Sequence, residues 1–212
     1  MSGPSDPTDS GLAGSTGPAV EPGHEIWLVR HGETEWARDG RHTGRTDVPL
    51  TDAGREQARA LGRRLSGHPF ALIISSPMSR AADTAHLAGF PDPETDPDLR
   101  EWDYGAMEGR RAAEIREDYP GWSIWDGPWP NGETIEHIAG RADRLVGRLR
   151  AIDGDVLVFA HGHVLRVFAA RWLGLPAEIG RHLALGTATI SRLGWERDTP
   201  VIETWNEACD TG

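Results

Sequence analysis

Histidine and arginine residues follow three apolar segments of this 212-residue chain. The segments and the polar residues after them are EIWLVR-HGET (25–34), FALIISS-PMSR (70–80) and DVLVFA-HGH (155–163). If the apolar segments are parallel neighbouring strands, their carboxyl ends meet at one edge of a sheet, where α/β proteins bind ligands. The pattern therefore predicts a site at which several basic side chains come together.

A phosphate group is the ligand that such a site favours. The formal net charge of the chain is −11, so an anion would bind only where positive charge is concentrated. Arg30, Arg80 and Arg166 would supply that charge, because the planar guanidinium donates two hydrogen bonds to paired oxygens. Helices that begin after the strands would add backbone N–H donors.

A histidine beside a bound phosphate can also act as a nucleophile. Neutral imidazole attacks phosphorus to form a phosphohistidine, and neighbouring cations disfavour its protonation. The leaving alkoxide then needs a proton donor, for which the segment 98–109 offers several carboxyl groups. Glu101 is the first candidate, in a context where partial burial would favour the acid form, and Asp103 and Glu108 are its rivals.

The elements that would position these residues alternate along the chain. The three apolar segments are continuous, which is typical of strands covered on both faces, whereas 188–195 and 200–205 alternate in polarity and predict strands nearer an edge. Helical periodicity lies between them, at residues 51–65, 79–89, 133–152 and 164–174. This order predicts an α/β fold, a three-layer sandwich with a largely parallel central sheet and helices on both faces.

Two segments fall outside this alternation. Residues 1–23 are mostly Gly, Ser, Pro, Asp and Thr and predict a disordered N-terminal tail, so the domain would span residues 24–212. Residues 102–134 contain Trp102, Trp122, Trp125 and Trp129 among prolines and glycines. We interpret this segment as a largely irregular insertion or lid beside the site, with a satellite core under a long loop as the alternative.

Composition excludes several classes of protein. No apolar run approaches the roughly 18–20 residues that span a bilayer, and no secretory signal is recognisable. The single cysteine, Cys209, excludes an internal disulfide framework and fits a cytoplasmic location. The acidic balance argues against nucleic-acid and anionic-membrane partners. His161 and His163 lack a cysteine or carboxylate cluster at ligand spacing, so no metal is expected.

The motifs as a set resemble the histidine phosphatase superfamily, the phosphoglycerate-mutase-like proteins. Arg30-His31-Gly32-Glu33-Thr34 is similar to the R-H-G-[EQ]-[ST] signature of that family. The resemblance extends from Glu25 to about Trp205 and includes GRTDVPLTDAGREQA (44–58), SSPMSRAADTA (75–85), the Leu-Arg-Glu segment (99–101) and AHGH (160–163).

The resemblance implies a role for each matching residue. His31 would be the phosphorylated nucleophile, and Arg30, Arg80 and His161 would bind the phosphoryl group. Glu101 would act first as the acid and then as the base that activates water, and Gly162 would present its backbone to the phosphate. Phosphatase action in this family needs no metal or organic cofactor.

A finer resemblance, to the sedoheptulose-1,7-bisphosphatase branch, lies in LREWDYGAMEG (99–109), the Trp-rich segment 122–134 and VFAHGHVLRVFAARWLGL (158–175). It implies that His42, Thr43, Tyr104, His163 and Arg166 line the substrate side, with Arg166 toward a distal phosphate. The chain departs from this branch after 194, where no histidine follows.

The sequence thus favours a phosphomonoester hydrolase that acts on a small sugar phosphate or bisphosphate. The alternatives are a phosphoglycerate mutase, a signalling phosphatase of phosphohistidine on a partner protein, and a non-catalytic phosphate-binding module. Family mutases usually carry Asn where this chain has Ala37, and a lid lysine where residues 102–134 have none. The Trp-rich insertion argues against the signalling protein, and the joint presence of His31 and Glu101 argues against the binding module.

Two further expectations concern surfaces. The basic residues of the third predicted helix are expected to lie on a solvated face; they are Arg141, Arg144, Arg148 and Arg150. The partner is expected to be a small phosphorylated metabolite, and whether the chain forms a homo-oligomer is left open.

Overall fold

The computed structural model describes residues 23–209, so the predicted tail lies outside the described residues apart from Gly23. One six-stranded sheet forms the centre of the fold, with the strand order β3-β2-β4-β1-β5-β6. The strands are β1 (Ile26–Arg30), β2 (Leu72–Ser75), β3 (Glu94–Thr95), β4 (Val156–Ala160), β5 (Thr189–Glu196) and β6 (Thr199–Ala208). No helix among residues 23–209 is long and apolar enough to cross a membrane.

The sheet is mixed. β3, β2, β4 and β1 are parallel neighbours, which places the three apolar segments side by side as predicted. β5 pairs antiparallel with β1, and β6 pairs antiparallel with β5. The α/β class is confirmed, but a largely parallel sheet is not, because the last two strands form a hairpin, and strands joined by a short turn run antiparallel.

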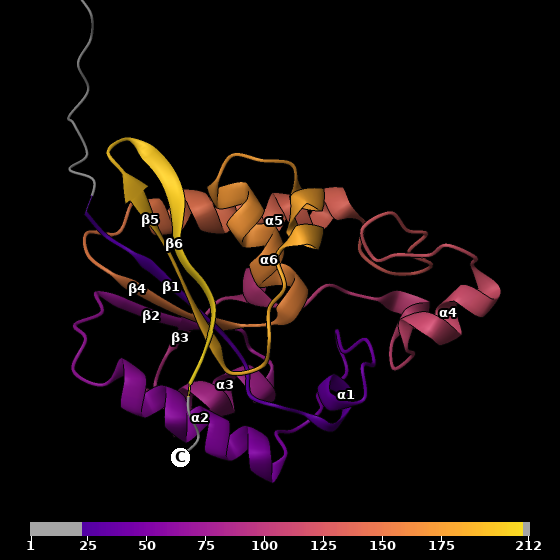
Figure 1. Ribbon diagram of the computed structural model, residues 1–212, viewed down its shortest axis with the longest axis horizontal. Coiled ribbons are helices and arrows are strands. Elements are labelled where there is room, and N and C mark those ends of the chain that lie inside the picture. The colour runs from indigo at the N-terminus through magenta and orange to yellow at the C-terminus, as the bar shows by residue number, and fades with distance from the viewer. Residues whose placement is uncertain (1–22, 210–212) are drawn as a thin grey trace, which may run out of the picture.

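Helices cover both faces of the sheet (Figure 1). They are α1 (Glu35–Arg38), α2 (Asp52–Leu65), α3 (Ser79–Leu87), α4 (Ala112–Asp118), α5 (Ile135–Arg150) and α6 (Gly162–Trp172), with 3₁₀ turns at Pro97–Leu99, Gly105–Met107 and Ala177–His182. Ile26 and Leu28 of β1 pack in one apolar cluster with residues of α5 and α6. Trp27 and Val29 pack in a second cluster with residues of α2 and α3. Successive strand side chains thus point to opposite faces, and both faces are buried.

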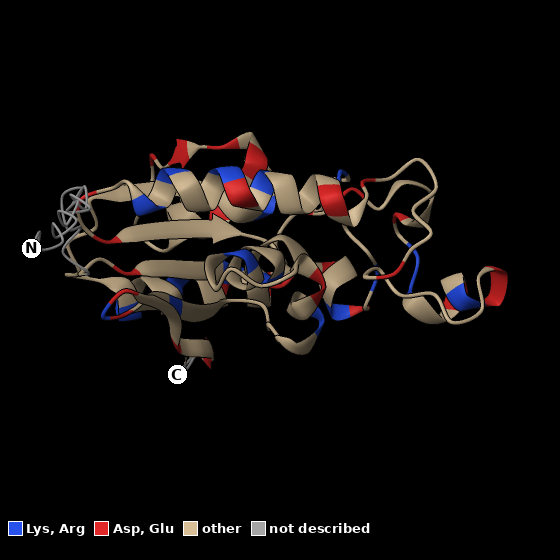
Figure 2. Ribbon diagram, turned by 90° about the horizontal axis from the view of Figure 1, so that it is seen from above, with Lys and Arg blue, Asp and Glu red and all other residues tan. Residues whose placement is uncertain are grey.

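The Trp-rich segment 102–134 is mostly irregular, apart from one 3₁₀ turn and the short helix α4. Figures 1 and 2 both show α4 at one end of the molecule, away from the sheet. Trp102, Trp122 and Trp125 are buried, and they belong to the same apolar cluster as α5 and α6. The tryptophans therefore extend the main core rather than forming a separate one, and movement of this segment as a lid stays a prediction.

Candidate active site

A cavity of about 190 Å³ lies at the carboxyl ends of β1 and β4. The predicted residues that line it are Arg30, His31, His42, Thr43, Glu101, Tyr104, Gly162, His163 and Arg166. Arg80 and His161 are not among the lining residues. The parallel pairing of β1 with β4 explains the convergence, since it places His31 and His161 one residue beyond paired strand ends.

His31 is held in one orientation and one tautomer. Its side chain is buried, and Nδ1 lies 2.7 Å from the carbonyl oxygen of Gly32. That oxygen can only accept, so Nδ1 carries the proton and Nε2 keeps its lone pair. Burial lowers the pKa of His31 well below its usual value, and the charges of Arg30 and Arg80 lower it further. The imidazole is therefore neutral and has a free nucleophilic nitrogen.

Gly32 fixes the backbone beneath this imidazole. Its N–H donates to Oγ1 of Thr84 on α3 at 3.0 Å, and a Cβ at Gly32 would collide with the carbonyl oxygen of Gly54 on α2. A side chain at this position would push α2 away from β1. The glycine after His31 is thus required by close packing.

Arg80 and His161 form a buried pair behind His31. Arg80 Nε donates to Nδ1 of His161 at 3.1 Å, and the His161 and His31 rings are 5.2 Å apart between centroids. With Nδ1 accepting, Nε2 of His161 carries the proton and donates to Oγ of Ser76 at 2.7 Å. Burial lowers the pKa of His161 well below its usual value, and the charge of Arg80 lowers it further. The sequence interpretation assigned no role to Ser76.

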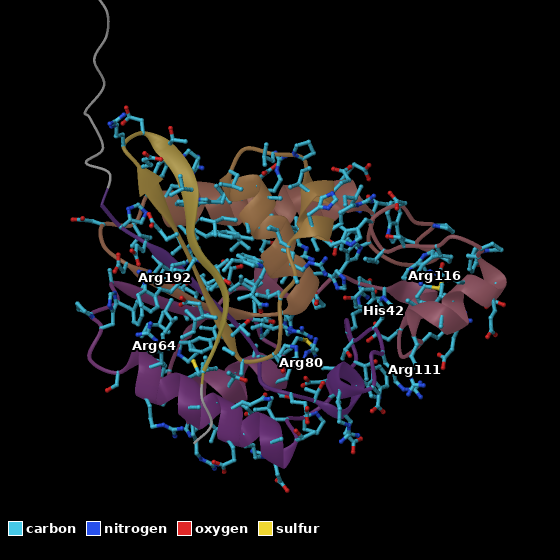
Figure 3. All side chains as sticks on the ribbon, viewed as in Figure 1. His42, Arg64, Arg80, Arg111, Arg116 and Arg192 are labelled. Atoms are coloured by element: carbon cyan, nitrogen blue, oxygen red, sulfur yellow. The ribbon has the colours of Figure 1, made fainter. Side chains whose placement is uncertain are left out.

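Arg80 also holds the loop that follows α1. Its terminal nitrogens donate to the carbonyl oxygens of Thr43, Gly44 and Thr46. Figure 3 shows Arg80 and, in that view, His42 between Arg80 and Arg116 of α4. Most donors of Arg80 are thus used within the protein, and its charge reaches His31 through space.

Arg30 offers an unused donor. Its Nη1 donates to the carbonyl oxygen of Leu185 at 2.6 Å, but its buried Nε has no partner among the described residues. The guanidinium lies against the start of α6, where a Cβ on Gly162 would be 3.4 Å from the Arg30 Cζ. A buried N–H without a partner is costly, and Arg30 also lines the cavity.

Of the three rival carboxylates, only Glu101 lines the cavity. Its Oε1 accepts from the backbone N–H of Trp102 and of Val164, and its Oε2 accepts from the N–H of His163, each at 2.9 Å. Asp103 is paired with Arg45 at 2.8 Å, and Glu108 accepts the N–H groups of the loop 44–46. Glu101 is therefore the carboxylate placed to exchange a proton with a ligand.

The substrate side of the cavity is built from neutral polar rings. The Tyr104 hydroxyl is hydrogen-bonded to Nδ1 of His163 at 2.7 Å, and Nδ1 of His42 donates to the carbonyl oxygen of Arg110 at 2.9 Å. The two imidazoles are stacked with their centroids 6.3 Å apart. Burial is the main cause that lowers the pKa of His42 and His163 and raises that of Tyr104. Neutral donors and acceptors of this kind suit hydroxyl groups.

Arg166 and Thr43 are partly committed to the protein. Arg166 donates to the carbonyl oxygens of Gly180 and Arg181 and lies 4.8 Å from the ring centre of Trp125. Thr43 Oγ1 donates to the carbonyl oxygen of Arg41 at 3.2 Å. Both residues still line the cavity.

The described residues contain no cluster of three or more His, Cys, Asp or Glu that could hold a metal ion. The cavity is lined by arginines, a neutral histidine and one carboxylate, a set that can bind a phosphoryl group.

Lowering the pH from 6.5 to 5.5 should destabilise the protein. Because the folded pKa values of His31, His161 and His163 are depressed, the unfolded state binds protons that the folded state does not. Stability is fully present above the unfolded pKa of about 6.5 and is lost as the pH falls toward the folded values. We expect the free energy of unfolding to fall by about 1 kcal/mol per histidine over this interval.

Urea titrations of the wild type and of His163→Gln at both pH values measure this loss. The variant should lose about 1 kcal/mol less than the wild type over the same interval. An identical pH dependence in both proteins would contradict the contribution of His163.

Comparisons with known proteins agree with this geometry. The profile described as histidine phosphatase superfamily (branch 1) matches residues 26–208. An acid phosphatase of Mycobacterium tuberculosis is 42% identical over 177 residues, which are 82% of this chain and 87% of the relative. A sedoheptulose 1,7-bisphosphatase of Saccharomyces cerevisiae is 37% identical over 185 residues, 71% of this chain and 68% of the relative. A solved structure of an open reading frame product of M. tuberculosis superposes with a TM-score of 0.84 at 40% identity, covering 87% of this chain and 98% of that one.

Proposed function

The chain belongs to the histidine phosphatase superfamily, and on that premise we propose that it hydrolyses small phosphate monoesters through a phosphohistidine at His31. The observation that carries the proposal is the presence of a neutral, tautomer-fixed imidazole and the Arg30 side chain in one cavity. Arg30 and the backbone N–H of Gly162, the first residue of α6, would hold the phosphoryl oxygens.

The first half of the reaction forms the covalent intermediate. Nε2 of His31 attacks phosphorus, the bond from phosphorus to the ester oxygen breaks, and Glu101 gives its proton to the leaving oxygen. The charge that develops on the phosphoryl oxygens is stabilised by Arg30 and Arg80. The fixed bond from Nδ1 of His31 to Gly32 keeps the ring aimed during the transfer.

The second half regenerates the enzyme. Glu101, now a carboxylate, takes a proton from a water molecule whose oxygen attacks phosphorus, and the bond from phosphorus to His31 breaks. The products are inorganic phosphate and a neutral imidazole. His161 supports this cycle indirectly, because its two ring nitrogens are bonded to Arg80 and Ser76.

We propose a small sugar phosphate or sugar bisphosphate as the substrate. The named relatives are an acid phosphatase and a sedoheptulose 1,7-bisphosphatase, and neutral His42, Tyr104 and His163 would bind sugar hydroxyls. Ala37 lines the cavity at the position where family mutases usually carry Asn, which supports hydrolysis over mutase action.

A second cavity lies beside the first and could hold the distal end of a longer substrate. This cavity, about 550 Å³, shares His42 and His163 with the first and is also lined by Arg116, Trp122 and Trp125. Arg116 Nε donates to the carbonyl oxygen of Trp122, and no contact of its two terminal nitrogens with another described residue is present. A second phosphate would therefore lie between Arg166 and Arg116.

Arg166→Ala or Arg116→Ala should raise the KM for sugar bisphosphates by about 10-fold more than for monophosphates, because each loses a contact worth about 1.4 kcal/mol. Steady-state kinetics on both substrate classes measure the difference. Arg38→Ala, which removes an exposed arginine outside both cavities, is the matched control. Equal effects on mono- and bisphosphates would remove the distal-phosphate assignment.

The proposed function is tested by a phosphate-release screen over sugar mono- and bisphosphates, with 3-phosphoglycerate and a phosphohistidine peptide included. A sugar phosphate as the best substrate supports the proposal. Preferred release from the peptide, or conversion of 3-phosphoglycerate without release, would replace it by the signalling or the mutase alternative.

A further inference from the structure

Arg141 on α5 is not on a solvated face, contrary to expectation. Its side chain and that of Glu133 are each only 14% exposed, and the two form a bidentate pair with both distances at 2.7 Å. The remaining terminal nitrogen of Arg141, Nη1, donates to the carbonyl oxygens of Asp98 and Arg100. All of its polar groups are thus used inside the protein.

Glu133 is bonded to the same segment from the other side. Its carbonyl oxygen accepts from Nε1 of Trp102 at 2.7 Å, and its N–H donates to the carbonyl oxygen of Asp103 at 2.9 Å. Arg141 therefore holds the backbone just before Glu101, and the main chain of Glu133 holds the Trp102 side chain and the Asp103 backbone just after it. The pair connects three parts of the chain: α5, the end of the Trp-rich segment, and the segment 98–103 that contains Glu101.

We propose that the Arg141–Glu133 pair positions Glu101 for proton transfer, an inference that rests on the proposed function. The carboxylate of Glu101 is bonded to the start of α6, but its backbone is not. The position of the carboxylate in the cavity therefore depends on where the backbone of residues 98–103 lies. A catalytic group displaced by about 1 Å can lose on the order of 10²-fold in rate. Arg141 and Glu133 do not line the cavity that contains His31, so in this proposal they act through Glu101.

The other arginines of α5 provide a matched control. Arg144 also pairs with Asp98, but through the Asp98 carboxylate, and the Arg144 side chain is 63% exposed. It makes no bond to the backbone beside Glu101. Its loss should leave the position of Glu101 unchanged.

The test is leaving-group dependence in Arg141→Lys and Glu133→Gln, with an alkyl phosphate and 4-nitrophenyl phosphate as substrates. Nitrophenolate leaves without protonation, so a misplaced acid slows only the alkyl ester. We expect kcat on the alkyl ester to fall by about 10- to 100-fold and on the nitrophenyl ester by less than about 3-fold. Arg144→Ala should change neither, and adding Arg141→Lys to Glu101→Gln should cause no further loss on the alkyl ester.

The outcomes separate the inference from the proposed function. Suppose that Glu101→Gln slows only the alkyl ester, while Arg141→Lys and Glu133→Gln either slow both esters equally or slow neither ester. The positioning role is then wrong and the mechanism stands. If Glu101→Gln itself is not selective, the acid assignment is wrong and the positioning role fails with it. If either Arg141→Lys or Glu133→Gln fails to fold, the other variant still tests the positioning role.

Discussion

Replacing His31 with alanine should abolish turnover, with a loss on the order of 10⁶-fold as expected when a covalent nucleophile is removed. No neighbouring group can substitute for it, because both ring nitrogens of His161 are bonded within the protein. The cavity should still bind phosphate, since Arg30 and the backbone N–H of Gly162 remain. Steady-state phosphate release and equilibrium phosphate binding measure the two effects separately.

The intermediate itself gives the decisive measurement. Wild-type enzyme mixed with labelled substrate and quenched in alkali should carry an acid-labile phosphate on the peptide that contains His31. His68→Gln, which removes a histidine bonded to Asp155 outside the cavity, is the control and should label normally. Label on His161, or retained activity in His31→Ala, would reverse the assignment of the nucleophile.

Replacing Glu101 with glutamine should slow hydrolysis of alkyl phosphates by about 10²–10⁴-fold, the usual contribution of a general acid. The effect on 4-nitrophenyl phosphate should be much smaller, because its leaving group needs little protonation. Glutamine keeps one oxygen for the N–H groups of Trp102 and Val164, but its amide group faces the N–H of His163. An unsatisfied N–H there costs roughly 1–3 kcal/mol of stability, so folding is checked by thermal unfolding.

Asp103→Asn is the matched control for the acid. Asp103 lies two residues along the chain, but it is paired with Arg45 and does not line the cavity. The kcat of this variant on both esters should stay within about 3-fold of the wild type, since asparagine keeps an oxygen for the N–H of Gly105 and loses only the charge of the pair with the exposed Arg45. An equal loss on both esters in Glu101→Gln would count against the acid role, and selective loss in Asp103→Asn would transfer that role to Asp103.

Much of the fold follows from local sequence pattern. The continuous apolar runs and the helical periodicities predicted β1, β2, β4 and the helices α2, α3, α5 and α6, because burial on two faces or on one stripe leaves a clear signature. Short elements such as α1, β3 and α4 were missed. Elements of a few residues carry too little periodicity to be recognised and depend on contacts with distant segments.

The role of Arg141 shows the limit of such patterns. Its spacing along α5 places it with Arg144 and Arg148, and nothing local distinguishes the three. Arg141 is only 14% exposed because Glu133 and the carbonyl oxygens of Asp98 and Arg100 meet it from other segments. Contacts between distant parts of the chain decide this, and a helical period cannot report them.

The sequence alone indicated phosphoryl chemistry, because its motifs resemble those of the histidine phosphatases and its histidines and arginines directly follow apolar segments, whose ends meet if the strands are parallel neighbours. The tertiary structure decided which of these groups line the cavity and which are bonded to one another. It places Glu101 rather than Asp103 or Glu108 at the cavity and turns Arg80 and His161 toward each other. The reason is physical: side-chain direction and burial are set by packing between segments, which residue type and spacing do not specify.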